Sequence, residues 1–536
     1  MSRVAFDRAA TIILAAILVV AAFLRFYKLD FDLPEVQYVD GAKFAGEAAR
    51  MARTGDLHPA LFQYPGLYVN LLVGLYRALG ITSEYGYQLA ATAVSALFGL
   101  ATVFVTACAA RNLTGTLAML IATALAAASP ALVTASRAPS PDVLCMFFMT
   151  VVFAVVTMQP ARMRTWVGLG AAAGLAVSAK WTGAFVLPVM ATTIAVTAWR
   201  RRSWALVLRQ APATALAALA AFLATTPFFL PMGDLYLGDL RFEAHLQRAG
   251  QIGRVQLNAL DYLISSTPTW ETPWLGTSLL SDLGLPVLLC SLAGIVLAMS
   301  GRFGFAGLSY AAIVVSFVVA VSGAGWIKAL RFLLPVYPLI CVLAGAFVES
   351  ALPTSLRQRP LVSVVAVVAL VAAPLSSSLS YVMALRQPST NAVAREWMRQ
   401  HVVAGSVVFL GPFFTEDFAP LAYPFIRFEG VGALQYNLPE ELGRSPEREP
   451  VYNGALVDDM KGAGVEYVVL NSYFDDAFTR VAENERFFPQ AVANYEAFQR
   501  RLRDEATSVF AIRGWQEGRV GPDISIWRFV PSSASQ

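Results

Sequence analysis

Acidic and basic side chains of this chain gather at the ends of its apolar segments, where they can act on a charged substrate. Asp40 follows the first apolar segment, and Asp142 begins another after the residues SRAPSPD. Lys180 ends the segment GLAVSAK, and Lys328 and Arg331 lie in WIKALRFLLPVYP. Carboxylates can take a proton from a nucleophile, and ammonium or guanidinium groups can hold a phosphate and stabilise a leaving charge. These residue types favour a displacement reaction on a lipid-linked phosphate.

Each of these residues also has an ordinary structural interpretation. Asp40 can be the N-cap of a helix, GAKFAGEAARMART, that lies along the membrane surface. Asp142 can stabilise the start of its helix, and Arg137 adds a cation to the same short loop. Lys180 can extend to the lipid headgroups, as can the two cations of WIKALRFLLPVYP. In the long loop at residues 227–283, a solvated basic face is the simpler interpretation of the residues around His245.

The composition is that of an integral membrane protein. Of the 536 residues, 57% are hydrophobic and 14% are charged, and the mean hydropathy is +0.57. Soluble domains are typically about 45–50% apolar and about 25% charged. Acids outnumber basic residues from Pro388 onward, whereas the part before it is basic, so we expect two regions with different surroundings. No basic stripe carries interleaved aromatic residues, which argues against nucleic-acid binding.

Eleven segments are apolar and long enough to cross a membrane, for which about 20 residues are typical. They are residues 9–27, 87–110, 116–135, 142–158, 165–180, 183–199, 204–226, 284–300, 304–321, 330–348 and 361–381. With these spans, six basic clusters all lie on one side, which the positive-inside rule makes cytoplasmic. Residues 66–80 are short and favour a half-span or re-entrant segment, so we expect about 11–13 transmembrane helices in all.

This topology predicts an α-helical polytopic membrane protein with a cytoplasmic N-terminus. Residues 1–383 would form the membrane domain, with outer loops at residues 28–86, 135–142, 227–283 and 322–331. Residues 384–536 would form a soluble, extracytoplasmic α/β domain. In it STNAVAREWMRQHV is typical of a helix, SVVFLG and VEYVVLN are typical of strands, and DISIWRFV is expected to close a sheet.

Five features in order give the membrane part a resemblance to a known class of enzymes. They are Asp40, HPALFQYPGLY, SRAPSPD, LAVSAKWTG and LRFLLPVYP, of which the last four are similar to P-x-x-F-x-Y-P-P-L, S-R-x-x-x-x-D, L-x-x-L-x-K-x and R-Y-L-L-P-x-x-P. Over residues 9–350 the chain resembles the GT-C glycosyltransferases of the protein O-mannosyltransferase and aminoarabinose transferase type. These polytopic enzymes use polyprenyl-phosphate sugars.

The resemblance implies roles for the motif residues. Asp40 would be the catalytic base, and Asp142 would support it or the acceptor. The candidates for binding the donor phosphate are Arg137, Lys180, Lys328 and Arg331. The candidates for contacting the substrate are His58, Tyr64 and His245.

Two positions depart from the family pattern. Gly41 follows Asp40 where protein O-mannosyltransferases usually have glutamate, which puts mannosyl transfer to proteins in doubt. Gly66 replaces the second proline of the Y-P-P element, from which a looser turn is expected.

The sequence favours an inverting glycosyltransferase that moves a sugar from a polyprenyl-phosphate donor to a glycan, lipid or protein hydroxyl. Its expected location is a bacterial inner membrane, among membrane lipids and with the reaction at the extracytoplasmic face. No metal site is expected and no cofactor is obligatory, although Asp40 and Asp142 could share Mg²⁺ or Mn²⁺ with a phosphate. A transporter or flippase of a lipid-linked sugar and a non-catalytic membrane scaffold remain alternatives; the first predicts ionisable residues at mid-membrane.

Overall fold

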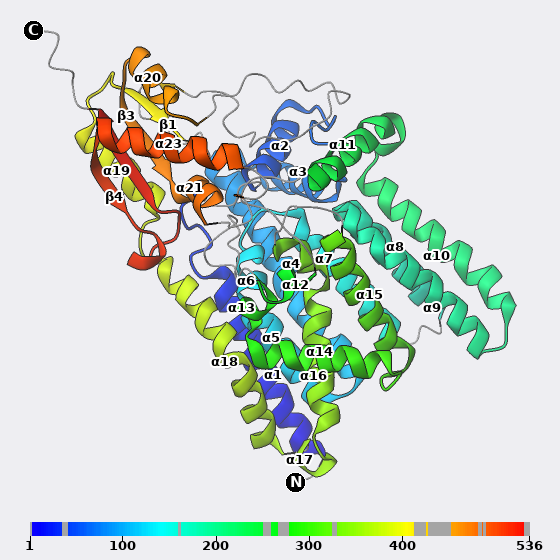
Figure 1. Ribbon diagram of the computed structural model, residues 1–536. Coiled ribbons are helices and arrows are strands. Elements are labelled where there is room, and N and C mark those ends of the chain that lie inside the picture. Colours follow the sequence, from blue (N-terminus) through cyan, green and yellow to red (C-terminus); the bar gives the residue numbers. More distant parts are fainter. Residues whose placement is uncertain are drawn as a thin grey trace, which may run out of the picture.

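The computed structural model describes residues 3–34, 41–158, 162–249, 259–265, 278–323, 330–357, 359–411, 425–426, 452–480, 485 and 489–529. Each of the eleven predicted spans contains a helix, and these helices form one bundle (Figure 1). They are α1 (Arg3–Phe26), α4 (Glu84–Leu113), α5 (Thr116–Ala128) with α6 (Pro130–Ser136), α7 (Pro141–Thr157), α8 (Met163–Ala179), η1 (Trp181–Phe185) with α9 (Val186–Arg200), α10 (Trp204–Thr225), α14 (Leu285–Met299), α15 (Gly304–Gly323), η2 (Leu330–Val336) with α16 (Tyr337–Ala351), and α18 (Pro360–Ala384).

The lengths of these helices agree with an integral membrane protein. Among the described residues, seven helices are long and apolar enough to cross a membrane, and the pair α5 and α6, bent by 59°, makes an eighth. The bend falls at Ser129, where Pro130 begins α6 and cannot continue the hydrogen-bond ladder of α5. The other predicted spans are α7, α8 and α14, with 17, 17 and 15 residues.

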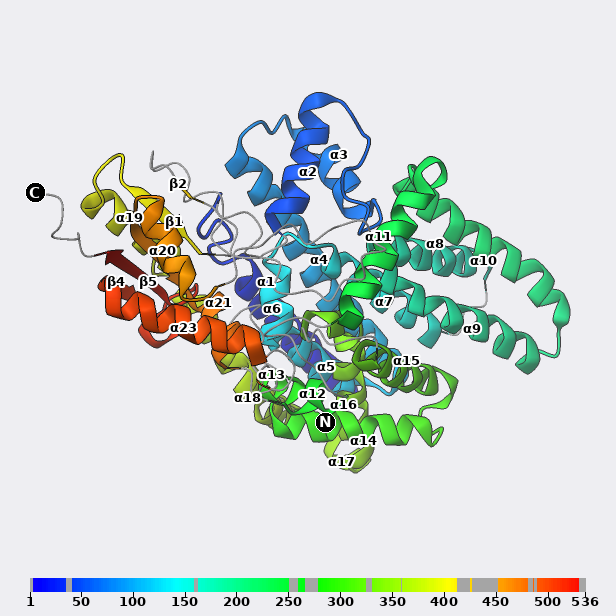
Figure 2. The same ribbon diagram turned by 45° about the horizontal axis from the view of Figure 1, so that its top comes forward.

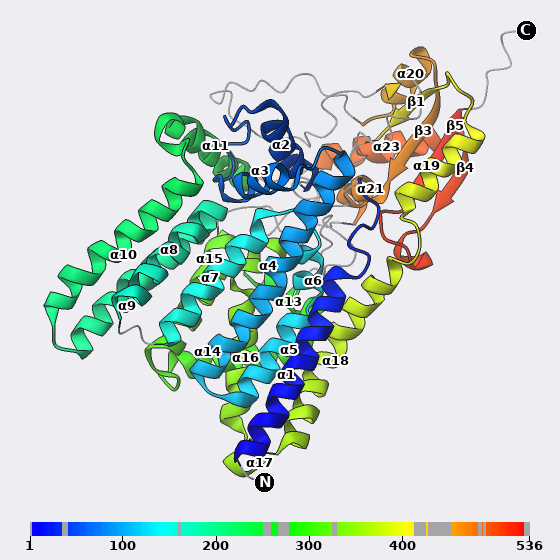
Figure 3. The same cartoon turned by 180° about the vertical axis from the view of Figure 1, so that it is seen from behind.

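Helices outside the predicted spans cover one end of the bundle. Three of them, α2 (Gly41–Thr54), α3 (Leu67–Leu79) and α11 (Phe229–Ala249), lie at the same end as the C-terminal domain (Figures 1 and 3). The N-terminus and α17 (Thr354–Arg357) lie at the opposite end. The predicted half-span is α3, which packs beside α2 across the end of the bundle. The amphipathic pattern of α2 places Phe44 and Ala48 in the core and leaves Lys43 exposed.

The C-terminal part has helices on both faces of a five-stranded sheet with the order β2-β1-β3-β5-β4. Strands β1 (Val407–Leu410), β2 (Phe425–Ile426) and β3 (Val465–Asn471) pair in parallel. Strand β5 (Ile524–Phe529) pairs antiparallel with both β3 and β4 (Ala506–Ile512). One face packs against α19 (Thr390–His401), and the other against α20 (Ala455–Gly462), α21 (Ser472–Thr479) and α23 (Pro489–Glu505). The predicted helix and strands are present. However, β5 does not close the sheet as an edge strand, because β4 lies outside it.

The C-terminal domain also contacts the segment that leaves α1. Phe31 packs with Leu385 and Val520, and the Arg386 guanidinium donates a hydrogen bond to the Tyr27 hydroxyl at 3.3 Å. Figure 2 shows this domain on one side of α1 and α6, with α8, α9 and α10 on the other side. The turn that follows α1 is thus held against the C-terminal domain.

A half-buried acid makes the stability of the C-terminal domain depend on pH. Burial, together with the neighbouring Asp476, raises the pKa of Asp475 to about 7, and the Tyr495 hydroxyl donates a hydrogen bond to it. An unfolded aspartate has a pKa of about 3.9, so the unfolded state releases its proton first. The protonated Asp475 therefore contributes its full stabilisation below the pKa that it has in the unfolded state. As pH rises from there toward 7, this contribution is lost at up to about 1.4 kcal/mol per pH unit.

We therefore expect Asp475→Asn to stabilise the domain at pH 8, and the gain to shrink as pH falls to 5. The measurement is the temperature at which the β3 amides lose exchange protection in the full-length protein, compared with the wild type at each pH. A gain that is independent of pH would contradict the assignment to this carboxyl group.

Candidate active site

An ion pair between Asp142 and Lys180 lies at the covered end of the bundle. Ser140 is the N-cap of α7 and Pro141 its first residue, which places Asp142 in the first turn. Lys180 is the first residue after α8, and its ammonium group pairs with the Asp142 carboxylate. The Ser140 hydroxyl donates a second hydrogen bond to that carboxylate at 2.9 Å. The side chains are only 5% and 14% exposed, so the pair is shielded from solvent.

A second cation and two aromatic rings surround this pair. Arg331, on η2, is close enough for its charge to act on the Asp142 carboxylate. The Lys180 ammonium lies 5.8 Å from the ring centre of Tyr64 and 5.6 Å from that of Phe332. The fold thus brings together four of the predicted site residues from four distant segments. Two cations beside one carboxylate leave a net positive charge, which suits a phosphate.

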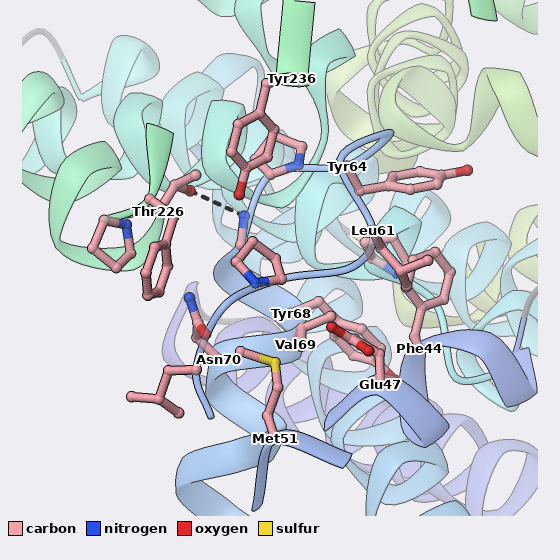
Figure 4. A pocket seen from close by; sticks show the side chains of 17 residues that line it. Phe44, Glu47, Met51, Leu61, Tyr64, Tyr68, Val69, Asn70, Thr226 and Tyr236 are labelled. Carbon is pink, nitrogen blue, oxygen red and sulfur yellow. Dashed lines mark hydrogen bonds between the residues drawn. The ribbon is translucent and has the colours of Figure 1, made fainter. Parts of the chain in front are cut away.

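A pocket lies next to the ion pair, and its lining includes Tyr64, whose ring faces Lys180, and Pro141, which precedes Asp142 (Figure 4). It encloses about 460 Å³, including the part open to solvent. Aromatic and aliphatic side chains form most of the wall, with a few polar groups. A mostly apolar wall with a few polar groups is typical of small-molecule sites. The polar groups include Glu47, Asn70, Thr226 and Tyr236.

Glu47 shapes one wall of this pocket. Its carboxylate accepts hydrogen bonds from the Arg50 guanidinium at 2.8 and 2.9 Å and from the Ala60 amide at 2.7 Å. Burial disfavours the charged form, but these donors outweigh it and hold the pKa of Glu47 below its usual value. Arg50 also donates to the His58 carbonyl at 2.6 Å. Glu47 is therefore charged, and its hydrogen bond from the Ala60 amide holds the loop that follows α2 in place.

Sequence and structure comparisons agree on the class of protein. Residues 15–237 match the sequence model of the family Dolichyl-phosphate-mannose-protein mannosyltransferase. No curated protein sequence matches the chain. ArnT from Cupriavidus metallidurans, solved with undecaprenyl phosphate, has a TM-score of 0.55 and 16% identity, over 98% of this chain and 99% of that one. The chain has the GT-C glycosyltransferase fold.

Further solved structures share this fold. The oligosaccharyltransferase of Archaeoglobus fulgidus in its apo form has a TM-score of 0.54 and 12% identity, over 96% of this chain and 74% of that one. The archaeal enzyme AglB, solved with an inhibitory peptide and a dolichol-phosphate, has a TM-score of 0.52 and 13% identity, over 96% and 74%. The GT-C fold expected from the motifs is confirmed, and the matches together indicate a glycosyltransferase.

Within the GT-C fold, Arg137 forms hydrogen bonds with backbone carbonyls at the end of α1 and is not part of the cluster around Asp142. Its guanidinium donates to the carbonyls of Arg25 at 2.9 Å and Lys28 at 2.8 Å, and it lies 6.0 Å from the Tyr381 ring. Arg25, itself fully buried, does the same for the carbonyls at the end of α5. The ends of helices leave carbonyls without intrahelical partners, which these arginines satisfy. We therefore interpret Arg137 as a capping residue of α1.

His58 is next to the pocket in sequence, since Leu57 and Pro59 line it. Its ring is 64% exposed, lies 4.9 Å from the Phe228 ring centre, and has Nδ1 2.7 Å from an Asp56 carboxylate oxygen. Asp40, Lys328 and the side chain of His245 lie outside the described residues, so their predicted roles stay predictions. Among the described residues, no group of three or more His, Cys, Asp or Glu side chains could hold a metal ion.

Gly66 is held more firmly than its departure from the Y-P-P pattern predicts. Its amide donates to the Thr226 hydroxyl at 3.0 Å, a hydrogen bond that proline could not make. A Cβ atom at Gly66 would lie 2.7 Å from both the Thr225 carbonyl oxygen and the Asn70 amide nitrogen. The end of α10 thus packs directly on this turn, and the expectation of a looser turn is wrong.

We expect Gly66→Ala to destabilise the protein by about 1–3 kcal/mol, because the backbone of α10 must move. Donor turnover should fall with it, since the turn carries Tyr64 and Pro65 into the pocket. Thermal unfolding and turnover of the purified protein measure both effects. Gly74→Ala is the matched control, because a Cβ there meets nothing within 4 Å. Equal behaviour of the two variants would contradict the packing argument.

Proposed function

We propose that this chain transfers a sugar from a polyprenyl-phosphate donor to an acceptor hydroxyl at the extracytoplasmic face of the membrane, with inversion at the sugar carbon. The convergence of Lys180 and Arg331 on Asp142, beside a pocket in a GT-C fold, carries the proposal. Solved proteins of this fold hold undecaprenyl phosphate or dolichol-phosphate, which are the leaving groups that such a donor would release.

The two cations would serve the leaving group. As the bond between the sugar carbon and the phosphate oxygen breaks, negative charge builds up on the phosphate. Lys180 and Arg331 would stabilise that charge in a site of low dielectric, where such stabilisation is large. Asp142 would keep the Lys180 ammonium in place. Since these cations supply the positive charge, we propose that no divalent metal is obligatory.

A carboxylate would serve the acceptor. We propose that Asp40 takes the proton of the acceptor hydroxyl while that oxygen attacks the sugar carbon. One displacement without a covalent sugar–enzyme intermediate inverts the configuration. The acid belongs to the same outer segment as α2, which lies at the covered end of the bundle. Arg302, Arg357 and the arginines between α9 and α10 carry the positive-inside signal, which favours a cytoplasmic side at the other end.

The test is turnover by the full-length protein in lipid vesicles with a panel of polyprenyl-phosphate pentoses and hexoses. We expect release of polyprenyl phosphate that depends on an added acceptor and persists in a chelator. Movement of intact donor across the vesicle membrane without cleavage would instead show a flippase. Absence of both cleavage and movement would favour a scaffold.

A further inference from the structure

Asp282 is a buried acid away from the ion pair. It lies on the short helix α13 (Leu279–Leu283) and is 2% exposed. One carboxylate oxygen accepts hydrogen bonds from the Ser129 hydroxyl at 2.8 Å and the Tyr337 hydroxyl at 2.9 Å. The other oxygen accepts one from the Ala131 amide at 2.8 Å. Three segments that are distant in the sequence therefore meet at one carboxylate.

Two of these segments lead directly to the proposed donor site. Ser129 and Ala131 begin α6, and the chain that leaves α6 reaches Asp142 through one short loop. Tyr337 is the first residue of α16, directly after η2, which carries Arg331. Both α6 and α7 pack against η2. A shift of α6 relative to η2 would therefore change the separation between the Asp142 carboxylate and the Arg331 guanidinium.

A second acid lies at the opposite end of the same pair of helices. Glu349, near the end of α16, is 8% exposed and accepts a hydrogen bond from the Ala118 amide in the first turn of α5 at 2.7 Å. Since α5 and α16 pack along one another, Asp282 and Glu349 hold the two ends of one helix pair. Both acids accept backbone amides at a helix N-terminus, where a negative charge is favourable. The Asp282 end adjoins the proposed site, whereas the Glu349 end does not.

We propose that Asp282 is a positioning residue of the donor site, which fixes α6 relative to η2 and so sets how Lys180 and Arg331 face the donor phosphate. Its effect on catalysis rests on the proposed function, but its effect on the position of these segments does not. Glu349 makes the equivalent contact for stability alone and provides the matched control.

Hydrogen exchange of the full-length protein tests the positional part without any substrate. In Asp282→Asn we expect faster exchange at residues 137–142 and 331–337, and little change there in Glu349→Gln. Tyr337→Phe removes one of the three hydrogen bonds and should give a smaller effect at the same residues, which keeps the test available if Asp282→Asn does not fold. Equal protection of both segments in the wild type, Asp282→Asn and Tyr337→Phe would overturn the proposal.

Donor kinetics test the catalytic part. We expect Asp282→Asn to lower kcat/KM for the donor at least tenfold, mainly through a higher donor KM, with an acceptor KM within twofold of the wild type. Glu349→Gln should keep the donor KM within twofold, even where its thermal stability falls equally. Parallel losses of activity in the two variants would overturn the positioning role. If the wild type consumes no donor, the proposed function fails, and the exchange data still decide whether Asp282 holds these segments.

Discussion

Asp40→Asn is expected to lower the rate of sugar transfer by about 10²–10⁴-fold, the range that a general base typically contributes. Asparagine is nearly the same size as aspartate but cannot accept the proton of the acceptor hydroxyl. The donor phosphate would still meet Lys180 and Arg331, so donor binding should change little. Single-turnover transfer and equilibrium binding of the donor separate these two effects.

Asp30→Asn is the control for this experiment. Asp30 is an exposed acid in the turn after α1, in the same outer segment, and its loss should leave transfer within twofold of the wild type. Unchanged transfer in Asp40→Asn would remove Asp40 from the mechanism. A tenfold or greater loss of donor binding in that variant would show that the acid serves the donor instead of the acceptor.

Lys180→Met is expected to affect both stability and transfer. It leaves the Asp142 carboxylate buried without its ammonium partner, and breaking a buried ion pair on one side typically costs about 3–5 kcal/mol. It also removes a cation from the proposed phosphate site, so transfer should fall by at least about 10²-fold, as for other groups that stabilise a developing charge.

The double variant Asp142→Asn/Lys180→Met separates these two roles. It removes both charges, so it should recover much of the stability that Lys180→Met alone loses. Transfer should stay as low as in the single variant, because the phosphate still lacks its cation. Thermal unfolding and turnover of the three variants complete the cycle. Recovery of transfer in the double variant would show that the pair serves folding alone.

The positions of the helical spans along the chain could be predicted from the sequence, because each span needs a long apolar segment. That Asp142 and Lys180 lie close together could be predicted for a related reason. Both residues lie where an apolar helix begins or ends, so both must lie near a membrane surface. Arg331 follows the same rule, since it lies at the start of the segment that becomes η2 and α16.

The roles of other polar residues could not be predicted, because they depend on contacts between distant segments. Arg137 belongs to a motif, yet its guanidinium caps α1, which the spacing of the motif does not reveal. Glu47 resembles an ordinary exposed acid of an amphipathic helix, but the loop after α2 folds back and buries it. Asp282 has no local signal at all, since its three partners begin two helices far away in the sequence.

The structure of the full-length protein with a bound polyprenyl phosphate tests the central claim most directly. The phosphate is expected within hydrogen-bond distance of the Lys180 ammonium and the Arg331 guanidinium, with the Asp40 carboxylate facing the same cavity. A phosphate bound at the N-terminal end of the bundle, or an Asp40 carboxylate turned into bulk solvent, would contradict the assignment of this site.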